Sequence, residues 1–156
     1  MNLNILVAYS TKGGASEQYA KTIAETLKSD GLNVEIYNLT NDIPDISNFD
    51  TIVLGTGVRM HMVYRRWKKI LKQKALHNKQ LYMFLSSGTA IEEPEKAVEK
   101  FLDPLVKKYD LKPKLMVSFP GIIPAKWAEN DEQKDTVKPE IAKKWAQEIS
   151  RQIKSK

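Results

Sequence analysis

The sequence predicts a single α/β domain built on a five-stranded parallel sheet, and two observations support this prediction. Short apolar runs alternate with amphipathic stretches along all 156 residues, which is the pattern of strands joined by crossover helices. Such crossovers are right-handed and bring the strands together in parallel. The composition, with 42% hydrophobic and 28% charged residues, suits one compact domain over residues 1–156.

The N-terminal part of the chain predicts a strand, a helix and a second strand. Residues 3–9 form a near-continuous apolar run, typical of a strand buried on both faces. Gly31 is placed to end the following helix as a C-cap. Val34 and Ile36 then alternate with polar neighbours in a short strand, which favours an edge of the sheet. The apolar residues of the helix have helical spacing: Ala20, Ile23, Ala24 and Leu27.

The rest of the chain continues the alternation. Buried strands are predicted over residues 51–54, 81–85 and 115–119, and a final helix from about residue 139. A helix that begins near Pro94 is expected to be kinked or shortened by Pro104. The apolar faces of these helices are Val63, Trp67, Ile70 and Leu71; Ala97, Val98, Phe101, Leu102 and Leu105; and Ile141, Ala142, Trp145, Ile149 and Ile153.

The loop after the first strand has the composition of an anion-binding loop. Glycines let the backbone approach a ligand, and the N-terminus of the next helix adds partial positive charge. The loop matches neither the dinucleotide fingerprint nor the NTPase phosphate loop. The alternative is an ordinary turn in which Ser16 is a simple N-cap. The candidate phosphate ligands are Ser10, Thr11, Lys12, Gly13, Gly14, Ala15 and Ser16.

The loops after the third and fourth strands are also rich in glycine and hydroxyl groups. In a sheet of order 2-1-3-4-5, a ligand binds where strands 1 and 3 diverge, so the loops after strands 1, 3 and 4 should meet. A response regulator shares this order but needs acidic residues at the ends of strands 1 and 3, where this chain has none. Generic turns are the alternative. The candidate residues are Thr56, Gly57, Val58, Arg59 and Met60, then Ser86, Ser87, Gly88 and Thr89.

These loops resemble those of the flavodoxin-like superfamily. The first is similar to the FMN phosphate loop Ser/Thr-x-Thr-Gly-x-Thr at Ser10, Thr11, Gly13 and Ser16, with departures at Lys12 and Ala15. The resemblance implies a flavodoxin-like three-layer sandwich with strand order 2-1-3-4-5. It also implies bound FMN, with the first loop on the phosphate and residues 56–60 and 87–89 on the ribityl chain and ring.

Within the superfamily, residues 9–13 and 55–61 most resemble the menaquinone-dependent protoporphyrinogen oxidases, whose second loop also carries an arginine. Electron-transfer flavodoxins usually stack aromatic side chains on the flavin, whereas the second and third loops here contain no Trp or Tyr before Tyr64. Nothing before Pro120 leaves room for the extra loop of long-chain relatives. The resemblance therefore leaves a carrier and an enzyme both open.

The charge is concentrated in one segment. Residues 51–91 contain no acidic residue but eight basic ones, and the whole chain has a net charge of +6. A one-signed block beside a ligand loop favours an anionic partner, although a solvated helix face is the ordinary explanation. Candidate partners are an acidic redox protein, an anionic membrane surface where a quinone is reached, and a carboxylate-bearing substrate such as a porphyrin. Nucleic acid is disfavoured because no recognition motif accompanies the charge.

The sequence thus predicts an FMN-binding electron carrier with a basic docking face. The alternative is an FMN-dependent protoporphyrinogen dehydrogenase that passes electrons to a quinone, and a flavinless interaction domain is the lesser alternative. No catalytic side chain is assigned, because the flavin would supply the redox chemistry. With no cysteine and two histidines, no metal site is expected. The absence of a signal peptide pattern or long apolar run predicts a cytoplasmic protein.

Overall fold

A parallel sheet of order β2-β1-β3-β5-β6 forms the centre of the computed structural model, and a short sixth strand, β4, pairs with β3. The structure describes residues 4–10, 15–39, 44–59, 62–63, 65–87, 93–121 and 137–155. All four neighbouring pairs along the path are parallel, so the predicted order 2-1-3-4-5 is confirmed. The strands are β1 (Asn4–Ser10), β2 (Asn33–Asn38), β3 (Thr51–Arg59), β4 (Met62–Val63), β5 (Gln80–Ser87) and β6 (Leu115–Pro120).

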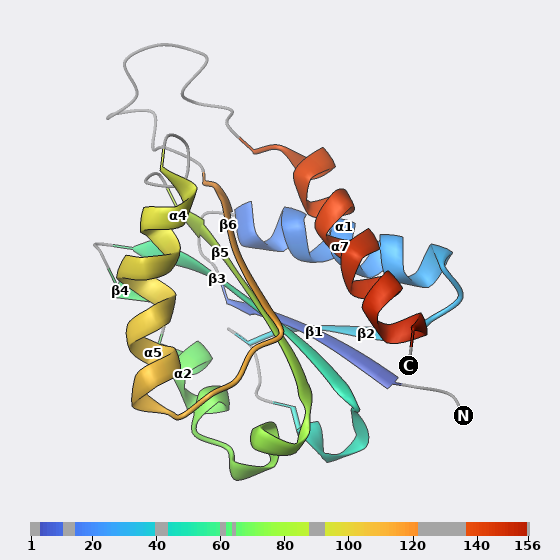
Figure 1. Ribbon diagram of the computed structural model, residues 1–156, viewed down its shortest axis with the longest axis horizontal. Coiled ribbons are helices and arrows are strands. Elements are labelled where there is room, and N and C mark those ends of the chain that lie inside the picture. The colour runs from blue at the N-terminus through green and yellow to red at the C-terminus, as the bar shows by residue number, and fades with distance from the viewer. Residues whose placement is uncertain are drawn as a thin grey trace.

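Helices cover both faces of the sheet, giving the three layers that the sequence predicts (Figure 1). Helices α1 (Ala15–Ser29) and α7 (Pro139–Lys154) lie side by side on one face. The other face carries α2 (Arg65–Leu71), α4 (Pro94–Ala97), the π-helical turn η3 (Val98–Leu102) and α5 (Asp103–Lys108). Two short 3-10 helices, η1 (Ile46–Asn48) and η2 (Lys74–Asn78), precede β3 and β5.

Strand β3 is longer than predicted. It continues past Gly55 to Arg59, and Arg59 then pairs with Met62 in an antiparallel bridge to β4. Val63 therefore lies in β4 and not in the helix, so both the predicted end of the strand and the predicted start of the helix are wrong. The cause is that an apolar residue suits either element, whereas the pairing of Val58 with Val63 is a tertiary contact.

Gly55 serves the packing of the sheet and is not part of a loop. It pairs with Phe84 of β5, and a Cβ atom at Gly55 would lie 1.8 Å from Phe84 Cζ. The Phe84 ring therefore occupies the space that a side chain at Gly55 would need. A glycine in a strand interior marks a close approach of this kind.

The helices follow the sequence with two differences, both on α7. Gly31 ends α1 with φ of 85° and donates to the Lys28 carbonyl, as predicted. Pro104 follows the π-helical turn η3, because proline lacks the N–H that would bond to the carbonyl four residues before it. Ile141 is exposed on α7, so its predicted inward position is wrong. The last difference is that Ala146 and Ser150 are buried instead.

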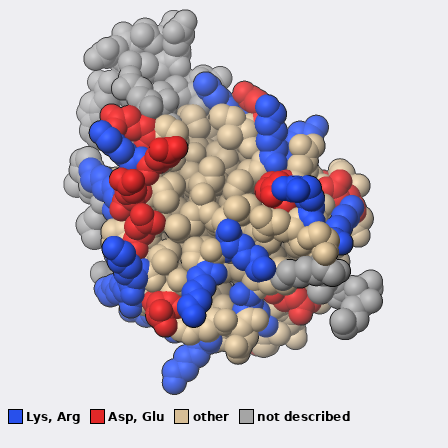
Figure 2. All heavy atoms as spheres, viewed as in Figure 1, with Lys and Arg blue, Asp and Glu red and all other residues tan. Residues whose placement is uncertain are grey.

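The two edges of the sheet are β2 and β6. The edge position of β2 is thus confirmed, and Ile36 on it is exposed. Figure 2 shows a largely uncharged surface along β6, between charged side chains over α4 to α5 and those over α7. The Ser118 hydroxyl of β6 donates to the Pro94 carbonyl and so holds the start of α4 against this edge.

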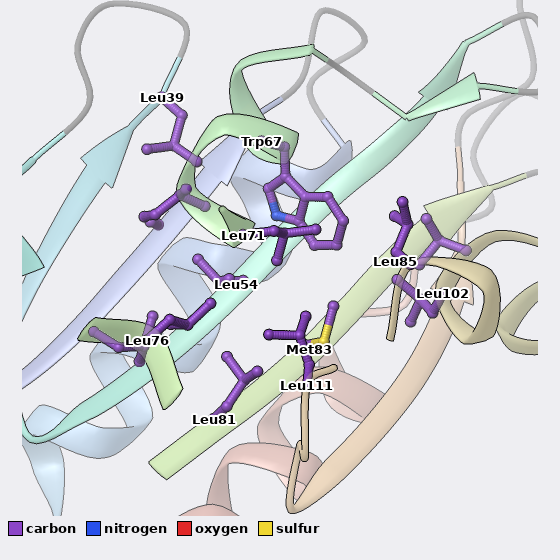
Figure 3. Close-up of a cluster of buried hydrophobic side chains, with 14 of the residues drawn as sticks. Leu39, Leu54, Trp67, Leu71, Leu76, Leu81, Met83, Leu85, Leu102 and Leu111 are labelled. Carbon is purple, nitrogen blue, oxygen red and sulfur yellow. The ribbon is translucent and has the colours of Figure 1, made fainter. Parts of the chain in front are cut away.

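The larger apolar cluster lies under α2, α4, η3 and α5. Figure 3 shows Trp67 and Leu71 of α2 over Leu54 of β3 and Met83 of β5, in a cluster that also includes Leu102. Trp67 is fully buried, as its helical spacing predicts, and its indole Nε1 has no hydrogen-bond partner among the described residues. The second cluster packs α1 and α7 on the opposite face, where Phe84, Phe119 and Trp145 form edge contacts between rings.

We predict that Gly55→Ala lowers the free energy of unfolding by about 3 kcal/mol, the upper part of the range for overpacked cores. The new methyl group would overlap the Phe84 ring. Urea unfolding of the wild type, Gly55→Ala, Phe84→Leu and the double variant measures the coupling. The double variant should be more stable than Gly55→Ala alone, and additive losses would contradict this explanation.

Candidate functional site

The candidate site lies at the edge of the sheet where the parallel strands end. Strand pairing places Ser10 of β1 beside Thr56 of β3, and Gly57 of β3 beside Ser86 of β5. Ser87 is in turn beside Pro120 of β6. This edge, which we call the rim, therefore brings together the described ends of the three segments that the sequence identified, and β6 adds a fourth.

Buried hydroxyl groups line the rim. Ser10, Ser16, Thr56, Ser86 and Ser87 are all at most 6% exposed. The Thr56 hydroxyl donates to the Gly57 carbonyl over 3.0 Å. Burying a hydroxyl without a hydrogen-bond partner costs free energy. Buried hydroxyls at strand ends are therefore oriented as hydrogen-bond donors and acceptors. Neutral donors of this kind fit a phosphate or a polyhydroxylated chain.

Ser16 and Ser86 bond to each other directly. Their hydroxyl oxygens are 2.7 Å apart in a buried contact between residues 70 positions apart in the chain. Helix α1 begins at Ala15, so Ser16 lies inside the first turn and is not the N-cap. The simple N-cap interpretation of Ser16 is therefore wrong. The contact connects the start of α1 to the end of β5 across the rim.

The first turn of α1 also carries an acidic residue, Glu17. Its carboxylate lies 3.0 Å from Lys21 Nζ and hydrogen-bonds with the Tyr9 hydroxyl. Burial raises the pKa of Tyr9, and the charge of Glu17 raises that pKa further. Because Glu17 is already paired, its repulsion of an anion at this end of α1 is partly offset.

Gly121 holds the end of β6 against the end of β5. Its N–H donates to the Ser87 carbonyl over 2.8 Å, and a Cβ atom at Gly121 would come within 2.9 Å of the Ser87 nitrogen. Only glycine allows this approach without a shift of the backbone. Sequence reasoning did not assign Gly121 to the site, although the Pro120-Gly121 pair at a strand end was an available signal.

Tyr19 connects β6, α1 and α7, and sequence reasoning did not identify it. Its hydroxyl donates to the Pro120 carbonyl and accepts from the Lys138 N–H over 3.0 Å. The ring is fully buried, with its centroid 4.7 Å from that of Phe119. Burial raises the pKa of Tyr19 to about 12. Its place four residues before Ile23 on the apolar stripe was the available sequence signal.

Several predicted site residues are described in part or not at all. Ala15 begins α1 and is buried. Val58 and Arg59 are described as the backbone at the end of β3. The remaining predicted residues lie outside the described residues: Thr11, Lys12, Gly13, Gly14, Met60, Gly88 and Thr89.

The described part of the rim favours anion binding over metal binding. The described ends of β1 and β3 carry hydroxyls, glycine and an arginine but no carboxylate. Across the described residues, no group of three or more His, Asp or Glu is placed to hold a metal ion.

Among the described helices, none combines the length and the apolar character needed to cross a bilayer.

Comparison with known proteins gives a match to a family model and to curated relatives. A sequence model of the family described as flavodoxin domain matches residues 6–126. Protoporphyrinogen IX dehydrogenase (quinone) of Escherichia coli strain K12 is 25% identical over 96 residues, which are 60% of this chain and 53% of that protein. The chain thus spans about half the length of the curated relatives it matches.

Solved structures share the fold at low sequence identity. Oxidised flavodoxin 1 from Bacillus cereus superposes with a TM-score of 0.67 at 16% identity, over 95% of this chain and 97% of that one. Rubredoxin oxygen:oxidoreductase from Desulfovibrio gigas superposes with a TM-score of 0.63 at 17% identity, over 97% of this chain and 36% of that one. These likenesses confirm the flavodoxin-like fold.

We predict that Tyr19→Phe lowers the free energy of unfolding by about 1–3 kcal/mol, because the Pro120 carbonyl and the Lys138 N–H both lose their partner. The substitution should also change the dependence on pH. The pKa of tyrosine is 10.0 in the unfolded chain, and burial raises the pKa of Tyr19 to about 12 in the folded chain. The unfolded state therefore releases its proton first, and stability falls as the pH rises through this interval.

Chemical unfolding of the wild type and of Tyr19→Phe between pH 8 and pH 12 measures this effect. The difference in stability between the two proteins should shrink as the pH approaches 12. Comparing differences removes the contribution of Tyr9 and Tyr82, whose pKa values are also raised by burial. Curves that stay parallel across the interval would show that Tyr19 is not responsible.

Proposed function

We infer that this chain, which belongs to the flavodoxin domain family, binds FMN at the rim and carries electrons between partners. The observation that carries the proposal is the convergence of buried hydroxyls from β1, α1, β3 and β5 on that edge. In sheets of this order a ligand lies at the switch point between β1 and β3. A flavin phosphate needs donors and few carboxylates, and the described donor set meets that requirement.

In this proposal the chain's own residues bind and orient the cofactor. Residues 10–16 hold the phosphate with hydroxyls, backbone N–H groups and the Lys12 charge. Residues 56–60 and 87–89 contact the ribityl chain and the ring. When bound, FMN supplies the ability to accept and release electrons reversibly. No side chain is assigned a covalent role, and the protein tunes the electrostatics of the cofactor.

The basic segment over residues 51–91 is the proposed docking face. It begins beside the rim, because Arg59 ends β3 and Arg65 starts α2. Lys69, Lys72 and Lys74 are exposed. In the part of the chain that the structure describes, the recorded ion pairs lie on α1, α4 and α7 and do not involve this segment. In this proposal the exposed charges of Lys69, Lys72 and Lys74 meet an anionic protein, membrane surface or substrate.

A second candidate function is direct oxidation of protoporphyrinogen with a quinone as electron acceptor. The observation that favours it is the match to protoporphyrinogen IX dehydrogenase (quinone) at 25% identity. A porphyrin carries carboxylates, which suits the basic segment. A flavinless interaction domain is the least supported function, because it leaves the buried hydroxyls of the rim without a role. A chain without cysteine is compatible with the reducing cytoplasm, where we place it.

The binding of FMN is tested first. Apo-protein is titrated with FMN while flavin fluorescence is followed, and the mixture is then dialysed. We expect the fluorescence to be quenched and the flavin to be retained by the protein. Failure of both would rule out the carrier and the enzyme together and leave the interaction domain.

The two redox functions are separated by an anaerobic assay with the FMN-loaded protein, protoporphyrinogen and a menaquinone analogue. As a carrier, the protein should be reduced by a flavodoxin reductase and should not turn over the porphyrinogen. Protoporphyrin formation in proportion to protein concentration would instead establish the enzyme. Raising the salt concentration should slow reduction by the partner, because exposed charges are screened.

We predict that Arg59→Ala lowers the midpoint potential of the bound flavin. A cation beside the rim stabilises the reduced, anionic form of the cofactor by Coulomb attraction, and Arg59 ends the strand that borders the rim. A redox titration of the wild type, Arg59→Lys and Arg59→Ala measures the shift, with Lys69→Ala as a charge-matched control on α2. Arg59→Lys should retain most of the potential, and equal shifts for Arg59→Ala and Lys69→Ala would refute a local role.

A further inference from the structure

We propose that Ser86 is a positioning residue for the FMN phosphate and acts through the hydroxyl of Ser16. The proposal rests on the FMN site proposed above. By sequence, the segment that contains Ser86 is expected to serve the ring and the ribityl chain. The structure supports a different role, because the Ser86 side chain bonds to the first turn of the helix that follows the phosphate loop.

Ser86 has a well-fixed place in the sheet. Its backbone lies between Gly57 of β3 and Phe119 of β6 in the parallel register. The next residue, Ser87, accepts a hydrogen bond from the Gly121 N–H. Ser16 is at the first turn of a helix that packs on this sheet. The contact of 2.7 Å therefore joins a fixed strand to the helix end that would face the phosphate.

The hydroxyls of Ser16 and Ser86 together have one more hydrogen-bond donor than the bond between them uses. Each hydroxyl has one proton and two lone pairs, and the bond between the two oxygens uses a single proton. Both side chains are buried, with Ser16 at 0% and Ser86 at 4% exposure. Water is therefore poorly placed to accept a hydrogen bond from the second hydroxyl proton. If Ser86 donates to Ser16, the Ser16 proton is the one that remains.

An anion at the start of α1 favours the arrangement in which Ser86 donates to Ser16. The helix N-terminus attracts a phosphate, and the Ser16 proton then turns to a phosphate oxygen while Ser86 donates to Ser16. Hydrogen bonds in such a chain polarise and strengthen one another. Ser86 would then strengthen binding of the phosphate without touching it. Ser86 should therefore strengthen the binding of FMN and have much less effect on the binding of riboflavin, which has the same ring and ribityl chain but no phosphate.

The test compares the dissociation constants of FMN and riboflavin by fluorescence quenching. The proteins are the wild type, Ser16→Ala, Ser86→Ala and the double variant. Loss of one neutral hydrogen bond should weaken FMN binding by Ser86→Ala roughly three- to tenfold, with less than about twofold for riboflavin. The double variant should bind FMN about as weakly as Ser16→Ala alone, because Ser86 acts only through Ser16.

Two further variants separate the hydroxyl from the fold. Ser150→Ala removes another buried serine hydroxyl, on α7 and far along that helix from the rim, and should leave both dissociation constants unchanged. Ser86→Thr and Ser86→Val have the same shape and differ by the hydroxyl, so Ser86→Thr should keep more of the preference for FMN. This comparison remains valid if Ser86→Ala does not fold.

The outcomes distinguish this proposal from the proposed function. Equal weakening of FMN and riboflavin by Ser86→Ala, additive losses in the double variant, or equal affinities for Ser86→Thr and Ser86→Val would each overturn the role of Ser86 while leaving FMN binding intact. A wild-type protein that binds neither flavin would overturn both proposals.

Discussion

The parallel pairing of β1 with β3 is the constraint on which the rest of the structure depends. The two strands are neighbours in the sheet although α1 and β2 lie between them in the chain. Because α1 leaves β1 toward one face and α2 follows β3 on the other, the two connections diverge at the rim. A crevice at that point is a property of the strand order and needs no particular side chain. At this edge the structure places the buried hydroxyls of Ser10, Thr56 and Ser86.

The two faces of the sheet and its rim follow different physical rules. On the faces, side-chain packing determines which residues fit. At Gly55, for example, the Phe84 ring occupies the space that a Cβ atom would need. At the rim, hydrogen bonding decides, because buried hydroxyls and backbone groups must find partners. Tyr19 belongs to both regions, since its ring packs on Phe119 while its hydroxyl joins Pro120 and Lys138.

The positive charge of this chain is concentrated in residues 51–91, which contain eight basic residues and no acidic one. The basic segment lies next to the rim on β3 and α2, while acidic and basic side chains both lie over α4 to α5 (Figure 2). A partner that approaches the rim would meet both signs within one domain, which favours a defined orientation over tight binding. This arrangement suits brief encounters for electron transfer, and it suits a carboxylate-bearing substrate equally well. The charge pattern does not choose between the two proposed functions.

The sequence by itself determined the number and order of the main elements, the edge position of β2 and the segments that meet at the rim, because periodicity and glycine placement are local signals. It misplaced the end of β3, Val63 and Ile141, since an apolar residue fits a strand, a helix or an exposed site until its neighbours are known. Only the tertiary structure joined Ser16 to Ser86 and Tyr19 to Pro120, pairs that lie 70 and 101 residues apart. Contacts of that separation depend on how the helices pack across the sheet, and no pattern within a short window of sequence encodes them.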